Sequence, residues 1–139
     1  MSPAVITRSP RVVNVPIRRT GPFAACSARE LARVNRCGDV VEIPADTVVQ
    51  PRTLHHWVYV VFDGMLAIDT GATALLIREG GAVGVRSTLL GGSFAASVTA
   101  LVETTIYVTT NREFAALARG VRGLASGVAG HLNPEFGAP

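Results

Sequence analysis

The sequence contains no lysine, few aromatic residues and only two cysteines. All 13 basic residues among its 139 are arginines, and aromatic residues make up 6% of the chain. Without lysine there is no Walker phosphate loop, which requires a Gly-Lys pair. No apolar run approaches the roughly 20 residues that a membrane-spanning helix needs, so we expect no membrane span. Apolar residues at 48% against charged residues at 17% are typical of one folded globular domain.

The two cysteines, Cys26 and Cys37, flank a predicted helix. A rise of about 1.5 Å per residue keeps them roughly 16 Å apart, whereas a disulfide needs Cα atoms within about 7 Å. We therefore predict two reduced thiols, as is typical of the cytoplasm. No apolar segment follows the N-terminal arginines, so we expect no secretory signal. The all-arginine composition is typical of a GC-rich bacterial genome, and we expect a bacterial, cytoplasmic protein.

The positive charge is concentrated near the N-terminus. Residues 1–20 contain Arg8, Arg11, Arg18 and Arg19 and no acidic residue, while the remainder holds nine arginines against ten acidic residues. We interpret residues 1–20 as a basic extended tail that either lies along the body or stays mobile, and in which residues 12–15 could add a short strand. On this interpretation, deletion of residues 1–18 should leave the melting temperature nearly unchanged. The near-neutral remainder does not favour nucleic-acid binding.

The rest of the chain predicts short strands between two helices. Ser27 and Glu30 have the spacing of a capping box and predict a helix over 27–36. Short β-branched runs separated by turn residues follow from 40 to 108 and indicate an antiparallel β-roll. A last helix is predicted over 111–131, capped by Asn111. The fold class is therefore mainly β, a jelly-roll-like antiparallel β-roll with one helix before it and one after.

One hairpin supplies a specific expectation about the core of the roll. Asp63-Gly64 is a tight-turn dipeptide, and apolar residues alternate on both sides of it. Because alternate residues of a strand face the same way, five side chains should share a buried face: Trp57, Tyr59, Val61, Leu66 and Ile68.

Six short motifs follow one another along the chain: Phe23–Val34, Ile43–Val48, Tyr59–Ile68, Gly84, Ala96–Val98 and Arg112–Phe114. In order and spacing they resemble the cyclic nucleotide-binding domain family, which includes the catabolite activator protein. Asp46 stands where the family usually has glycine. The resemblance implies the same β-roll and divides the chain into a tail (1–20), a cyclic nucleotide-binding-like domain (21–132) and a C-terminal tail (133–139).

The resemblance also implies a ligand site with altered residues. In the family, a phosphate-binding cassette supplies a glutamate to the ribose and an arginine to the cyclic phosphate. Val85 stands at the glutamate position and Phe94 at the arginine position, so the cassette looks degenerate. Arg86 lies one residue beyond the missing glutamate. The candidate ligand-binding residues are Gly84, Val85, Arg86, Ser87, Phe94 and Ser97.

The predicted last helix carries an apolar seam beside a stripe of glycines. The seam consists of Phe114, Leu117, Val121, Leu124 and Val128, and the stripe includes Gly120, Gly123 and Gly127. Each glycine costs a helix about 1 kcal/mol relative to alanine. We therefore expect another segment, of this chain or of a partner, to pack closely against the glycine stripe. The seam either packs on the chain's own roll or forms a homodimer interface, and we favour the homodimer.

These residues predict a non-enzymatic regulatory or protein-interaction module that lacks ordinary cyclic AMP binding. The alternative is a cyclic AMP sensor that uses Arg86 and backbone amides. We find no catalytic constellation and no cofactor motif, and we interpret His55-His56 as loop residues rather than metal ligands. Only 133–139 follow the last helix, so we expect no direct DNA binding. The protein partner is not indicated.

Overall fold

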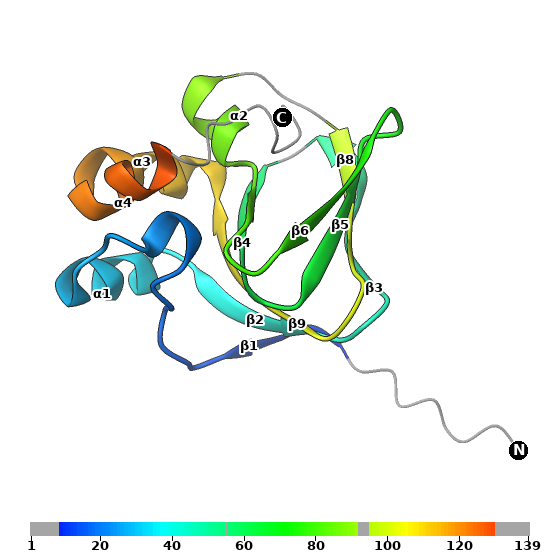
Figure 1. Cartoon of the computed structure of the whole chain (residues 1–139), viewed down its shortest axis with the longest axis horizontal. Coiled ribbons are helices and arrows are strands. Elements are labelled where there is room, and N and C mark those ends of the chain that lie inside the picture. Colours follow the sequence, from blue (N-terminus) through cyan, green and yellow to red (C-terminus); the bar gives the residue numbers. More distant parts are fainter. Residues whose placement is uncertain (1–8, 55, 92–94, 130–139) are drawn as a thin grey trace, which may run out of the picture.

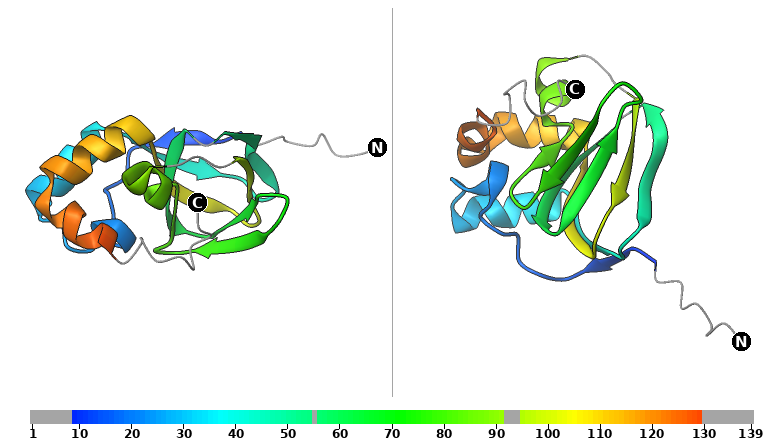
Figure 2. Two further views of the ribbon diagram at one scale, coloured as in Figure 1. Left: turned by 90° about the horizontal axis from the view of Figure 1, so that it is seen from above. Right: turned by 45° about the vertical axis from the view of Figure 1, so that its right-hand side comes forward.

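The computed structural model describes residues 9–54, 56–91 and 95–129. Within them, two antiparallel sheets face each other, and α1, α3 and α4 lie beyond one of them (Figures 1 and 2). The strands are β1 (Arg11–Val13), β2 (Asp39–Ile43), β3 (Thr47–Leu54), β4 (Trp57–Asp63), β5 (Met65–Asp69), β6 (Ala74–Arg78), β7 (Ala82–Val83), β8 (Ala95–Ala100) and β9 (Thr104–Thr110). The helices are η1 (Gly21–Phe23, a 3-10 turn), α1 (Ala28–Arg36), α2 (Val85–Leu90), α3 (Asn111–Gly120) and α4 (Arg122–Val128). The predicted β-roll with flanking helices is confirmed.

The core is divided between the two faces of the larger sheet. That sheet has the strand order β1-β2-β9-β4-β7, and the smaller one has the order β3-β8-β5-β6. The roll interior, between the sheets, contains residues such as Tyr59, Val61 and Ile106. The helix-side core, between the larger sheet and the helices, contains residues such as Val60, Phe62 and Tyr107. Strand β4 is consequently buried on both faces, which explains its continuous apolar sequence.

The hairpin prediction is correct for four of its five residues. Tyr59, Val61, Leu66 and Ile68 are buried together in the roll interior. Trp57 was predicted to join them, but 43% of its surface is exposed. It is the first residue of β4 and pairs with Thr110, the last residue of β9, so it lies at the end of the sheet.

Helix α1 begins as predicted and is tied to two other elements. Ser27 and Glu30 form the capping box, with Glu30 Oε1 accepting from the Ser27 amide at 2.8 Å. Glu30 Oε2 also accepts from the Gly123 amide at 3.0 Å, so one carboxylate serves the N-termini of α1 and α4. At the other end of α1, the Tyr107 hydroxyl donates to the Val34 carbonyl at 2.7 Å.

The double role of Glu30 predicts a pH-dependent contribution to stability. Hydrogen bonds from the Gly123 and Ser27 amides lower the pKa of the Glu30 carboxyl from its ordinary 4.5. A carboxyl whose pKa is lower in the folded state stabilises the fold above its ordinary pKa, and that stabilisation is lost as pH falls through the folded-state value. Thermal melts should therefore show wild type losing more stability than Glu30→Gln as pH falls from about 5 to 3.

A matched control for this melt is Glu113→Gln. Glu113 occupies the equivalent position in α3, where the Thr110 side chain accepts from its amide. Equal pH dependence in wild type and Glu30→Gln would contradict the bridging role of Glu30.

The predicted last helix is in fact two helices. Val121 adopts an extended conformation (φ −114°, ψ 106°) and separates α3 from α4. The cap of α3 is Thr110, whose side chain accepts from the Glu113 amide at 3.1 Å, and not Asn111 as expected. The break turns α4 back across α3 and onto η1.

Residues 9–20 lie along the body, which is one of the two arrangements expected for them. Strand β1 pairs with β2, as the short-strand alternative had allowed. Ile17 is buried in the helix-side core. The Arg18 guanidinium donates to the Phe62 carbonyl at 3.0 Å, and the Arg19 guanidinium donates to the Cys26 carbonyl at 3.0 Å. Two of the arginines therefore bind the chain's own backbone. Arg8 lies outside the described residues.

Candidate functional site

The segment that corresponds to the cassette runs from β7 through α2 to β8. Gly84 adopts a positive φ of 88° at the start of α2, a conformation that favours glycine. Val85 follows it and is 2% exposed. Its side chain packs in the helix-side core and not in the roll interior. The residue at the position of the family's ribose-binding glutamate is thus a core residue in this chain.

The other predicted cassette residues have different surroundings, as far as the described residues show. Arg86 is half-buried and already interacts with another group. The Ser87 hydroxyl donates to the Gly84 carbonyl at 3.3 Å, within the first turn of α2. Ser97 alternates along β8 with buried Ala96 and Val98, so it lies on the outer face of the smaller sheet. Phe94 lies outside the described residues.

The roll interior contains a polar pair that the sequence analysis did not identify. The Tyr59 hydroxyl donates to Gln50 Oε1 at 3.0 Å. The Gln50 amide donates in turn to the Ala96 carbonyl at 3.1 Å. Burial raises the pKa of Tyr59 to about 12, so its hydroxyl stays neutral at physiological pH. The sequence signal that could have indicated this pair is the glutamine at an inward position of β3, because a buried amide requires hydrogen-bond partners.

Charge is absent from the buried part of the described structure. The buried polar or charged residues there are Gln50, Thr104 and Thr109, none of which is ionised. The cassette residues Gly92-Ser93-Phe94, which lie outside the described residues, have no ionisable side chain either. Within the described residues, no three His, Cys, Asp or Glu side chains lie close enough together to bind a metal ion.

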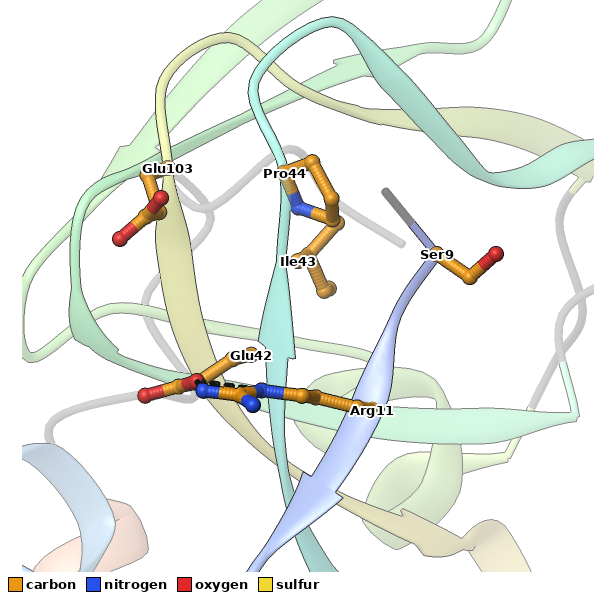
Figure 3. Close-up of a pocket in the computed structure, with 6 residues that line it drawn as sticks. All are labelled: Ser9, Arg11, Glu42, Ile43, Pro44 and Glu103. Atoms are coloured by element: carbon orange, nitrogen blue, oxygen red, sulfur yellow. Dashed lines mark hydrogen bonds and ion pairs between the residues drawn. The ribbon is translucent and has the colours of Figure 1, made fainter. Parts of the chain in front are cut away.

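One hollow of about 270 Å³ lies at the start of β1, against the end of β2 and the β8–β9 turn. Figure 3 shows the Arg11 side chain reaching from β1 to Glu42 on β2, with Glu103 apart from them. The Arg11 guanidinium bonds Glu42 Oε1 at 2.7 and 3.0 Å. Their side chains are 70% and 38% exposed, so the pair is a surface ion pair of small energy.

The apolar seam faces the chain's own core. Phe114, Leu117, Val121, Leu124 and Val128 are each at most 5% exposed and belong to the helix-side core. The glycines allow α4 to approach the segment that precedes α1. A Cβ on Gly123 would lie 2.6 Å from the Ala25 carbonyl oxygen, and one on Gly127 would collide with the Pro22 carbonyl. The close approach inferred from the glycines therefore occurs within one chain, while the homodimer remains a prediction.

Solved structures share this architecture. The catabolite activator protein of Thermus thermophilus matches at a TM-score of 0.63 and 21% identity, over 80% of this chain and 55% of that protein. The sensor domain of the transcriptional regulator DNR from Pseudomonas aeruginosa matches at 0.64 and 16% identity, over 83% and 86% of the two chains. The CBD2 domain of PKAR, with Sp-2Cl-cAMPS bound, matches at 0.60 and 14% identity, over 82% and 76%.

The chain has the fold of a cyclic nucleotide-binding domain. The resemblance seen in the sequence is thereby confirmed at the level of fold. No family model matches the sequence, and no curated protein matches it. The chain spans just over half of the Thermus protein, which it matches over 55% of that protein's length. No helix within residues 9–54, 56–91 and 95–129 is long and apolar enough to cross a membrane.

Proposed function

We propose that this chain is a non-enzymatic regulatory or protein-interaction module that uses a cyclic nucleotide-binding fold without binding cyclic AMP in the ordinary way. Its structural neighbours include the sensor domain of a transcriptional regulator, which supports a regulatory role. The chain would act through a protein partner, and possession of this fold does not require it to bind DNA directly.

The observation that carries the proposal is the uncharged buried interior. A cyclic nucleotide carries a negative phosphate, which loses its hydration on entering an apolar site. Hydrogen bonds to charged groups are worth roughly 1.5–3 kcal/mol each. Val85 and Phe94 cannot make such bonds, and Val85 packs in the helix-side core. The absence of two such bonds should cost several powers of ten in affinity.

Titration calorimetry with cyclic AMP and cyclic GMP tests this proposal. We expect no binding tighter than about 1 mM, equivalent to about −4 kcal/mol. A domain of known cyclic AMP affinity, measured in the same buffer, provides the positive control.

Micromolar binding by the unmodified protein would refute the proposal and favour the sensor alternative. Arg86→Gln would then test whether Arg86 holds the phosphate. Arg78→Gln is the matched control, because Arg78 is an exposed arginine on β6.

A further inference from the structure

A second hollow opens between the inner face of the larger sheet and β3, an edge strand of the smaller sheet, and none of the described residues that line it belongs to the cassette. It has a volume of about 290 Å³ and is lined by Pro10, Val41, Val49, Trp57, Tyr59 and Val108, among others. We call it the Trp57 groove. Its walls come from β2, β4 and β9 of the larger sheet and from β3 of the smaller one. Trp57, which is 43% exposed, is one of the residues that line this groove.

The strands beside the groove are poor templates for an added peptide strand. Strand β3 is an edge of the smaller sheet, but it contains Pro51, and its pairing with β8 shifts register twice, between Val48 and Gln50 and between Gln50 and Thr53. Proline removes a ladder donor, and irregular pairing distorts the edge. Strand β1, the edge of the larger sheet, has only three residues. These features favour a small molecule over a peptide as occupant.

The lining determines the charge of a suitable ligand. None of the described residues that line the groove is ionisable except Tyr59, whose pKa is raised to about 12 by burial. An ionic ligand would lose hydration without a countercharge. The Tyr59 hydroxyl donates its proton to Gln50 Oε1 and carries no charge. A neutral molecule matches this lining.

The volume and the aromatic walls of the Trp57 groove determine the size and shape of a suitable ligand. An apolar cavity of about 150 Å³ accommodates one benzene ring, so a groove of about 290 Å³ accommodates two fused rings. Aromatic rings stack or pack edge to face against indole and phenol rings, and Trp57 and Tyr59 supply both. We propose that the Trp57 groove binds a neutral, planar, two-ring apolar molecule. This site is independent of the cassette, so it stands whether or not the chain binds a cyclic nucleotide.

The probe pair for a direct test is 2-naphthol and naphthalene-2-sulfonate, which share the ring system and differ in charge at pH 7. Trp57 is the only tryptophan in the chain, so its indole N–H gives one side-chain signal in the nitrogen–proton spectrum of the labelled full-length protein. We expect 2-naphthol to shift this signal saturably with a dissociation constant below about 1 mM. The sulfonate should bind at least about tenfold more weakly.

Two adjacent residues of β3 supply matched variants. Val49 lines the groove, whereas Val48 is 58% exposed and is not one of the groove's lining residues. Val49→Phe should fill the groove and weaken 2-naphthol binding at least about tenfold, while Val48→Phe should leave it unchanged. If Val49→Phe lowers the melting temperature markedly, calorimetry on Trp57→Ala provides a second measure, with loss of binding expected.

Three results would overturn the proposal. They are the absence of a saturable Trp57 shift with 2-naphthol, equal binding of the sulfonate, and equal effects of Val48→Phe and Val49→Phe. None of them bears on cyclic AMP binding, which is measured separately.

Discussion

Replacing Gly127 by alanine is expected to lower the free energy of unfolding by about 1–3 kcal/mol. The new methyl group would collide with the Pro22 carbonyl oxygen and would lie 2.8 Å from the carbonyl carbon. Both atoms belong to the backbone of η1, which is fixed by the burial of Phe23 in the helix-side core. Relief therefore requires α4 to move away from η1, which would loosen the packing of Leu124 and Val128. Urea unfolding monitored by circular dichroism measures the change.

Gly120→Ala is the matched control for this measurement. A Cβ on Gly120 would lie 2.7 Å from the Arg33 guanidinium, the far end of an exposed, flexible side chain. The arginine can shift, and alanine favours the helix by about 1 kcal/mol. We expect the free energy of unfolding of Gly120→Ala to lie within about 0.5 kcal/mol of the wild-type value or to be slightly higher. Equal unfolding midpoints for Gly127→Ala and wild type would show that the contact with η1 is not tight.

The same variants discriminate between the two interpretations of the glycine stripe. If the glycines serve the packing of α4 on η1, Gly127→Ala changes stability and leaves the sedimentation behaviour alone. If they serve a homodimer, the variant shifts the protein toward monomer. The burial of the seam in the chain's own core leads us to expect the first result.

Deletion of residues 1–18 is expected to lower the free energy of unfolding by at least about 3 kcal/mol. Burial of an isoleucine side chain contributes about 1.5–3 kcal/mol, and Ile17 is 8% exposed. Strand β1 pairs with β2 over three residues, and Arg18 satisfies the Phe62 carbonyl. Phe62 lies at a register shift between β4 and β9, where the sheet itself does not provide its partner. The melting temperature should fall by about 10 °C or more.

Comparing Arg18→Ala with Arg11→Ala separates two contributions to stability: the hydrogen bond from Arg18 to the Phe62 carbonyl and the positive charge of an arginine in this segment. Loss of a partner by a buried carbonyl costs about 1–3 kcal/mol, which we expect for Arg18→Ala. Among the described residues, the Arg11 side chain pairs with Glu42 at an exposed position, so Arg11→Ala should cost less than about 1 kcal/mol. A truncated protein that melts within about 2 °C of the full chain would restore the interpretation of residues 1–20 as a tail.

The errors of sequence interpretation share one cause. The apolar spacing from Phe114 to Val128 fits one helix, yet Val121 breaks it because α4 must turn to cover η1. Trp57 fits the alternation of a buried hairpin face, yet it lies where the sheet ends. The arginines of residues 9–20 gave no indication of partners in the body, yet Arg18 and Arg19 bind backbone carbonyls. In each case a contact distant in sequence overrode a local pattern.

The sequence by itself determined those helices and turns whose ends are marked by capping or turn residues. Ser27 and Glu30 predicted the capping box of α1, and Asp63-Gly64 predicted the turn between β4 and β5. Asp46, at the family's glycine position, has a positive φ of 62°, as that turn requires, and aspartate is one of the few residues that tolerate it. The order of these motifs also predicted the β-roll, because each depends on residues within a few positions of one another.

Only the tertiary structure decided which side chains share a space. It placed Val85 in the helix-side core and Ser97 on the outer face of the smaller sheet, two positions that the family resemblance by itself does not distinguish. It brought Gln50 and Tyr59 together across the roll and left Trp57 beside an uncharged groove. The physical reason is that a site depends on distances between strands far apart in sequence, and these distances are set by how the two sheets and the helices pack together.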